Sequence, residues 1–311
     1  MNNIILFTQL IFLSISSLSI NRENKVSSNA NYSIDKIKGY FDNDDLEDYI
    51  IRSEKNKLSY TIYINNGKGF DAKKKFTISE EDFDEVENAL DNLFISNPKK
   101  GEIVIGSSCC ASLKTTELNY YKFFDGINNW VLYKSSTSTI DSDFIPDIKT
   151  VILDFSYTIE GNKIATKTLK NQESLKLKIN NTNKFNDLFN KYKLANNNSS
   201  VNNISEELNF DDLSEIILFI PISKDNIEKY NDFAYYLGLS KKGNNYSIFI
   251  LKNIIKIYPT RTVAFLNLAD SYYNVEEKNK AKTNYKKYIS LMITQGKDLK
   301  KVPQRVYDRS K

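Results

Sequence analysis

Short runs of apolar and aromatic residues, separated by turn-forming residues, begin at Ile37 and dominate the first half of the chain. Runs rich in Tyr, Ile, Phe and Val are typical of β-strands. The strands that this pattern predicts are Tyr49–Arg52, Leu58–Ile64, Leu93–Ile95, Ile103–Ile105, Tyr120–Phe124, Trp130–Tyr133, Val151–Tyr157 and Lys163–Lys167. The intervening turn residues favour hairpins. We therefore expect an antiparallel β-sheet or a small β-sandwich over residues 35–170.

One stretch before the Leu93 strand has a different period. Phe83, Val86 and Leu90 fall at helical spacing, and Ser79 precedes them as a capping residue. The same residues would also fit a loop that leads into the strand. We favour one or two helical turns.

Helical periodicity takes over in the last third of the chain. Leu213, Ile216, Ile217 and Ile220 form one amphipathic element, which Pro221 ends. The Asn/Ser cluster from Asn196 to Asn203 separates this region from the strands and is typical of a linker. The sequence predicts an α+β chain, in which a linker region over residues 171–205 joins the antiparallel β-domain to an all-α stack of helical hairpins over residues 206–311.

The N-terminal segment Ile4–Ile20 is apolar and uncharged, and a charged stretch follows it. It is short for a membrane span and suits the core of a secretory signal, with small residues at Ser17 and Ser19. We expect a signal peptide over residues 1–19 and a polar leader over residues 20–34. This interpretation predicts a periplasmic or secreted protein of a Gram-negative bacterium, without a stable membrane anchor after cleavage. An uncleaved anchor is the alternative.

The composition removes several kinds of chemistry. The chain contains no histidine, which excludes Ser-His and Cys-His nucleophiles and His-ligated zinc. Neither a phosphate-binding GxxxxGK loop nor a GxSxG elbow is present. The net charge of +4 is too small to favour nucleic acid as a partner. The two cysteines, Cys109 and Cys110, are adjacent, which leaves a vicinal disulfide, free thiols or an intermolecular link open.

The segment Phe233–Met292 resembles the tetratricopeptide (TPR) family, whose repeats are helical hairpins of about 34 residues. Ala264–Tyr273 matches the first helix of a repeat, with Leu268-Ala269 as its Leu-small pair, and Ala281 and Tyr285 match the second helix. Ser247 and Leu251 precede them by 34 residues, although the first helix of that earlier unit lacks the Leu-small pair in register. The resemblance implies a protein or peptide as partner, bound on a concave face. The residues that it places on this face are Leu266, Asp270, Tyr273 and Asn274.

The segment Gly39–Ile51 is similar to the acidic loops of FG-GAP-type β-domains in exported bacterial proteins. Such loops often hold Ca²⁺ through carboxylate oxygens. The resemblance implies a calcium site at Asp42, Asp44 and Asp48, with no other cofactor. The chain departs from the pattern at two positions, because Tyr40 replaces the first acidic residue and Asp45 replaces the turn glycine.

These observations lead to one main functional hypothesis and two alternatives. The main hypothesis is a non-catalytic exported protein that binds another protein through its helical module. An inhibitor or immunity protein with a single cognate toxin or enzyme would have the same sequence features. A carboxylate-dependent hydrolase would require Asp42, Asp44 and Asp48, which are the clustered carboxylates of the chain. Clustering in one loop suits a cation better than an acid/base pair that faces across a cleft.

Overall fold

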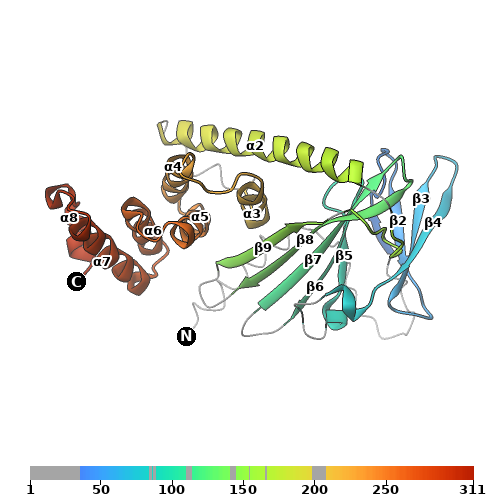
Figure 1. The fold of residues 1–311 in the computed structure, drawn as a ribbon. Coiled ribbons are helices and arrows are strands. Elements are labelled where there is room, and N and C mark those ends of the chain that lie inside the picture. The colour runs from blue at the N-terminus through green and yellow to red at the C-terminus, as the bar shows by residue number, and fades with distance from the viewer. Residues whose placement is uncertain are drawn as a thin grey trace. The chain divides into compact units, whose positions relative to one another are not determined.

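The computed structural model describes residues 36–83, 86, 89–109, 114–140, 145–153, 155–164, 167–197 and 208–311 (Figure 1). The predicted signal peptide and leader, residues 1–34, lie outside the described residues. The chain divides into a β unit (Met1–Ser142 and Lys149–Glu173) and a helical unit (Asp143–Ile148 and Ser174–Lys311). Two antiparallel sheets followed by helices confirm the predicted α+β class. No helix within the described ranges is both long and apolar enough to cross a lipid bilayer.

The first sheet has the strand order β1-β2-β3-β4, and every neighbouring pair is antiparallel. Its strands are β1 (Lys36–Gly39), β2 (Asp48–Arg52), β3 (Ser59–Asn65) and β4 (Phe70–Thr77). Ile50 pairs with Ile62, and both side chains are buried. The neighbouring pair Tyr49 and Tyr63 lies on the other face, where the ring centroids are 4.8 Å apart. The period of two thus gives this sheet one face in the core.

The second sheet has the order β5-β6-β7-β8-β9. Its strands are β5 (Phe94–Ser96), β6 (Glu102–Cys109), β7 (Lys114–Phe124), β8 (Asn129–Ile140) and β9 (Pro146–Ile152). The predicted hairpin is confirmed, with Phe123 opposite Trp130. Two 3-10 turns, η1 (Glu80–Asp82) and η2 (Ala89–Asn92), precede β5 and confirm the short helical turns after Ser79.

Three sequence predictions for the strands were wrong or incomplete. The strand expected at Val151–Tyr157 forms only over its first two residues, because β9 ends at Ile152 and Phe155 has a φ of 60°, which a β-strand does not allow. Lys163 forms only an isolated bridge with Tyr157. The strands β1 and β4 were missed. Three consecutive lysines in β4 conceal its alternation, and lysine on an edge strand discourages pairing with other chains.

Both sheets of the β unit share one hydrophobic core. The single tryptophan, Trp130, is fully buried there, and its indole Nε1 donates a hydrogen bond of 2.5 Å to the backbone oxygen of Phe41. The largest fully buried side chains of this core are Phe41, Ile50, Ile62, Ile103 and Trp130. Trp130 therefore fastens the second sheet to the segment that joins β1 and β2.

The predicted linker over residues 171–205 is wrong for most of its length, because α2 (Lys167–Asn197) is a continuous helix. It contains neither glycine nor proline, and Phe185, Leu188 and Tyr192 are buried at helical spacing. The Phe185 ring stacks on Tyr230 with centroids 4.6 Å apart. The many Asn residues around these three positions made their helical spacing hard to recognise in the sequence. Residues 198–207, which hold most of the expected Asn/Ser linker, lie outside the described residues.

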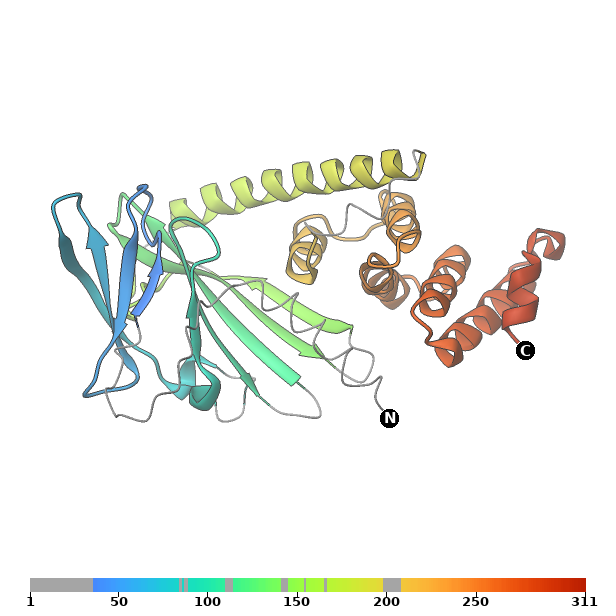
Figure 2. The same cartoon turned by 180° about the vertical axis from the view of Figure 1, so that it is seen from behind.

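After α2, the helical unit consists of a series of shorter helices, which both views show in succession from α3 to α8 (Figures 1 and 2). They are α3 (Phe210–Phe219), α4 (Ile227–Gly238), α5 (Asn244–Ile257), α6 (Thr262–Asn274), α7 (Lys278–Thr294), the 3-10 turn η4 (Leu299–Lys301) and α8 (Gln304–Arg309). The side chain of Asn209 accepts a hydrogen bond of 2.8 Å from the backbone N–H of Asp212 and caps α3. The predicted helix before Pro221 is thereby confirmed.

The helices form two similar hairpins, α4/α5 and α6/α7. The second helices begin 34 residues apart, at Asn244 and Lys278, whereas the first helices begin 35 residues apart. With a spacing of 35, Phe233-Ala234 corresponds to Leu268-Ala269, and Ala234 and Ala269 are both fully buried. The earlier hairpin therefore does have an apolar-small pair, which a fixed spacing of 34 hides.

Candidate functional site

Three pairs of side chains at a constant spacing of 35 residues define a surface that we call the ladder face. Its members are Tyr235 and Leu239 on α4, Asp270 and Asn274 on α6, and Arg305 and Arg309 on α8. Each pair is separated by four residues, so its two members lie on one face of their helix. Because α4 packs against α6, and α8 bonds to α6, the three pairs lie next to one another.

Asp270 is the centre of the polar contacts on the ladder face. Its Oδ1 accepts a hydrogen bond of 2.6 Å from the Tyr285 hydroxyl and one of 3.2 Å from Arg305 Nε. Its Oδ2 accepts one of 2.8 Å from Arg305 Nη2, so the guanidinium contacts both carboxylate oxygens. Arg309 Nη1 lies 3.5 Å from Oδ1. The Asp270 carboxylate thus contacts two arginines and a tyrosine.

The pKa values of this cluster follow from its contacts. The hydrogen bonds to Asp270 and the negative charge of its carboxylate raise the pKa of Arg305, although burial acts in the opposite direction. Burial, helped by the hydrogen bond to Asp270, raises the pKa of Tyr285 to about 12. Tyr285 therefore keeps its proton at neutral pH and remains a donor. Two guanidinium groups thus share this one carboxylate, and Asp308 adds a second negative charge on α8 itself.

The other residues predicted for the partner face also contact the chain itself. The Arg309 guanidinium lies 3.7 Å from the ring centroid of Tyr273, a cation–π contact. Asn274 Nδ2 donates to the backbone oxygen of Gly238 at 3.3 Å and to Asn244 Oδ1 at 3.1 Å. Leu266 is partly buried against the helical core. The structure brings Asp270, Tyr273 and Asn274 together, both Leu266 and Tyr273 pack against the helical core, and partner binding at all four stays a prediction.

The open end of the ladder face lies on α4. Tyr235 is 47% exposed and Leu239 is 43% exposed. Sequence reasoning missed both residues, and it also missed Arg305 and Arg309. The signal that would have found them is the spacing of 35 residues from Asp270 and Asn274. This surface therefore combines an apolar end at α4 with two arginines at α8.

Small side chains bring the helices under this face close together. A Cβ atom on Gly238 would lie 3.0 Å from Ser271 Oγ and 3.3 Å from Ser247 Oγ. These two hydroxyls are buried and share a hydrogen bond of 2.9 Å. The close approach of α4, α5 and α6 fixes the positions of the exposed residues above them.

The predicted calcium loop lies between β1 and β2. Asp42 Oδ1 accepts a hydrogen bond of 3.0 Å from the N–H of Asp44, and Asp44 Oδ1 accepts one of 2.8 Å from the N–H of Leu46. Both are Asx turns. Asp48 is buried, and its two oxygens accept from the N–H groups of Phe41 at 2.8 Å and Asn65 at 2.9 Å.

Each of these carboxylates thus has a structural role within the loop. Burial raises the pKa of Asp42 and also that of Asp48. Within the described ranges, no three His, Cys, Asp or Glu side chains form a group that could hold a metal ion. Ca²⁺ binding at Asp42, Asp44 and Asp48 stays a prediction.

The second sheet contains buried charges that the sequence analysis did not single out. Tyr133 donates a short hydrogen bond to Glu102, and Lys134 Nζ lies 3.5 Å from the ring centroid of Tyr120. All four side chains are buried. Because each has a partner, the cluster stabilises the sheet rather than presenting reactive groups. Cys109, at the end of β6, is disulfide-bonded, and Cys110 lies outside the described residues.

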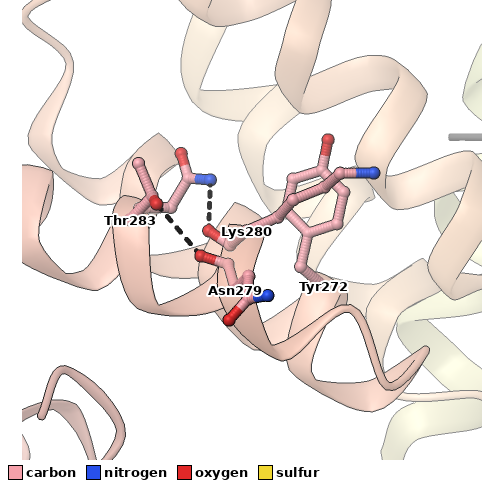
Figure 3. A pocket seen from close by; sticks show the side chains of 5 residues that line it. Tyr272, Asn279, Lys280 and Thr283 are labelled. Atoms are coloured by element: carbon pink, nitrogen blue, oxygen red, sulfur yellow. Dashed lines mark hydrogen bonds between the residues drawn. The ribbon is translucent and has the colours of Figure 1, made fainter. Parts of the chain in front are cut away.

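A shallow pocket of about 380 Å³ lies between α6 and α7 (Figure 3). Tyr272, Asn279, Lys280, Thr283 and Asn284 line it. The Thr283 hydroxyl donates to the backbone oxygen of Asn279 at 3.0 Å, and Asn284 Nδ2 donates to that of Lys280 at 2.8 Å. These side chains already bond to their own helix, so the pocket offers a ligand few unused polar groups.

Comparisons with known proteins give no family for this chain. No protein-family model matches it, and neither a curated protein nor a solved structure matches it significantly. The resemblances to tetratricopeptide repeats and to FG-GAP-type domains therefore stay predictions from the sequence.

Proposed function

We propose that this chain is an exported, non-catalytic protein that binds another protein or peptide on the ladder face of its helical unit. The observation that carries the proposal is the pair Tyr235 and Leu239, two large apolar side chains that remain exposed beside Asp270 and Arg305. Aromatic residues and arginine are the anchors that protein interfaces favour. The ladder face presents both kinds.

The charges on this face suggest the chemistry of the partner. Arg305 is exposed while its guanidinium contacts Asp270, so one edge of the group remains available. A segment with one apolar or aromatic side chain and an acidic residue a few positions away would match Tyr235, Leu239 and Arg305. The absence of histidine from the sequence supports a binding role over acid–base catalysis at neutral pH. Export remains part of the proposal on the strength of the apolar segment Ile4–Ile20.

Site-specific photocrosslinking tests the proposed face. The full chain would be expressed in a Gram-negative host with a photoreactive phenylalanine at position 235, and the periplasm would be fractionated. The matched control carries the same group at Tyr40, which is 45% exposed in the β unit. We expect one dominant adduct from position 235, absent at position 40, and lost when Leu239 is also replaced by Ser. Equal adducts at both positions, or a chain found only in the cytoplasm, would contradict the proposal.

A further inference from the structure

Basic residues are concentrated at one end of the helical unit. Residues 278–311 contain eleven Lys or Arg and only two Asp, whereas acidic residues outnumber basic ones in the rest of the chain. The net charge of +4 for the whole chain does not reveal this uneven distribution of basic residues. A local surplus of one sign creates a surface potential that attracts partners of the opposite sign.

The surplus includes an exposed turn that we call the basic tip, residues Ile293–Lys301. Every residue in it is exposed. Gly296, with a φ of 62°, reverses the chain after α7, and Asp298 caps the following turn η4 through the N–H of Lys300 at 3.0 Å. Ile293 is 59% exposed and Leu299 is 44% exposed. The tip therefore presents aliphatic side chains together with lysines.

Several lysines around these aliphatic residues are available for a partner. Lys300 and Lys301 in the tip, and Lys286 and Lys287 on α7, form no ion pair with any residue that the structure describes. Lys286 lies seven residues before Ile293, two helical turns away on the same exposed stripe. The unpaired charges and the exposed aliphatic groups thus belong to one continuous surface.

This combination fits a lipid surface better than a protein or a nucleic acid. Lysines beside an anionic membrane are attracted to phosphate, and neighbouring aliphatic side chains enter the boundary between headgroups and acyl chains. Protein interfaces are depleted in lysine. Single-stranded nucleic acids are bound by aromatic stacking, and the basic tip carries no aromatic residue.

We propose that the basic tip docks reversibly on the surface of an anionic phospholipid bilayer. Lys300 and Lys301 contact lipid phosphates, and Ile293 and Leu299 insert into the interface. The docking goes beyond the proposed binding function and does not depend on it, because none of these four residues belongs to the ladder face.

Vesicle co-sedimentation of the full chain tests this proposal. Neutral phosphatidylcholine vesicles measure the binding that the apolar segment Ile4–Ile20 contributes. Vesicles that also contain phosphatidylglycerol measure the additional binding to negative charge, which should fall steeply as salt is added. Equal binding to both kinds of vesicle would overturn the proposal.

Two pairs of variants locate the additional binding. Lys300→Glu with Lys301→Glu should reduce it at least about fivefold for each lysine. The control, Lys55→Glu with Lys57→Glu, changes the net charge equally at two exposed positions of the β unit and should retain it. An equal loss in both double variants would show that only the total charge matters and would refute docking at the tip.

Replacing the exposed aliphatic residues of the basic tip distinguishes docking on a membrane from binding to an acidic protein. Ile293→Ser with Leu299→Ser should weaken binding to the anionic vesicles several-fold, whereas Ile257→Ser, at a residue 49% exposed on α5, should not. Circular dichroism of each variant checks that the helices remain folded. If the serine variants bind normally and polyglutamate competes as well as the vesicles do, the partner is an acidic protein and the membrane proposal fails.

Discussion

Replacement of Asp48 by asparagine should destabilise the β unit by about 2–4 kcal/mol. Both oxygens of Asp48 accept backbone N–H groups, from Phe41 at 2.8 Å and from Asn65 at 2.9 Å. Asparagine has one oxygen, so its Nδ2 donor would face one of the two N–H donors. A hydrogen bond to a charged group contributes about 1.5–3 kcal/mol, and a buried donor left without an acceptor costs about 1–3 kcal/mol. The lost hydrogen bond and the donor left without an acceptor are partly the same cost, so the expected loss of about 2–4 kcal/mol is smaller than the sum of the two ranges.

Urea unfolding followed by tryptophan fluorescence measures this change. Trp130 is the only tryptophan of the chain and bonds to Phe41, the residue that also donates to Asp48. The matched control is Asp44→Asn, because the asparagine oxygen can still accept the N–H of Leu46. The control should stay within about 0.5 kcal/mol of the original protein. An Asp48→Asn variant as stable as the control would refute the structural role of Asp48.

The pH dependence of the same comparison has a definite sign. Burial raises the pKa of Asp48 above its ordinary value of 3.8, so the folded protein binds this proton more tightly than the unfolded chain does. The stability linked to this proton is fully present below the ordinary pKa and is lost as the pH rises through the raised pKa. The difference in unfolding free energy between the original protein and Asp48→Asn should therefore increase as the pH is lowered towards 3.8. A difference that shrinks instead would mean that the two backbone hydrogen bonds outweigh burial.

Four further outcomes follow from the packing and the charges. Gly106→Ala should cost about 1–3 kcal/mol in urea unfolding, because its Cβ would lie 2.4 Å from the Phe94 ring and 2.6 Å from Leu118; an unchanged midpoint would show that both side chains can move. Ala269→Leu should cost a similar amount, measured by circular dichroism, because Ala269 is fully buried between helices. Arg305→Ala should cost no more than about 1 kcal/mol by the same measurement, since the ion pair with Asp270 is partly exposed; a much larger loss would mean that α8 is required for the whole stack to fold. If the acidic loop binds Ca²⁺, saturating Ca²⁺ should raise the urea midpoint and Asp44→Asn should abolish the rise, whereas an unchanged midpoint would contradict the calcium site.

The sequence correctly predicted those elements whose apolar residues recur at a regular spacing or whose ends are marked by turn residues. The hairpin of β7 and β8 follows from the turn residues at 125–129, and α3 and α6 follow from apolar residues at helical spacing. The helix α2 was missed because Asn and Lys surround its buried stripe, and tertiary packing against Tyr230 outweighs the low helix propensity of Asn. Phe155 ended a predicted strand through its backbone conformation, which no hydrophobic pattern reveals.

The candidate sites were harder to predict, because sequence shows which groups a residue offers but not which groups already satisfy it. The alternating carboxylates of the acidic loop suggested a cation. In the structure Asp42, Asp44 and Asp48 accept backbone N–H groups, a role that the alternation of carboxylates does not reveal, and Ca²⁺ binding stays a prediction. The bonding partners of these acidic residues depend on a turn geometry that only the folded chain defines.

The bonding partners of Asp270 in the helical unit were also not predictable from the sequence. They suggest where on the ladder face a partner would bind first. Its position on a repeat-like helix predicted a contact with another molecule, yet its oxygens hold Arg305, which lies 35 residues further along on a helix of six residues. So short a helix gives no periodic signal in the sequence. Because Arg305 on α8 already bonds to Asp270 on α6, a partner that first bound at Asp270 would have to break a bidentate ion pair. A partner that begins at Tyr235 and Leu239 breaks no such contact, so binding should start at α4, and substitutions there should weaken it more than substitutions at Asp270.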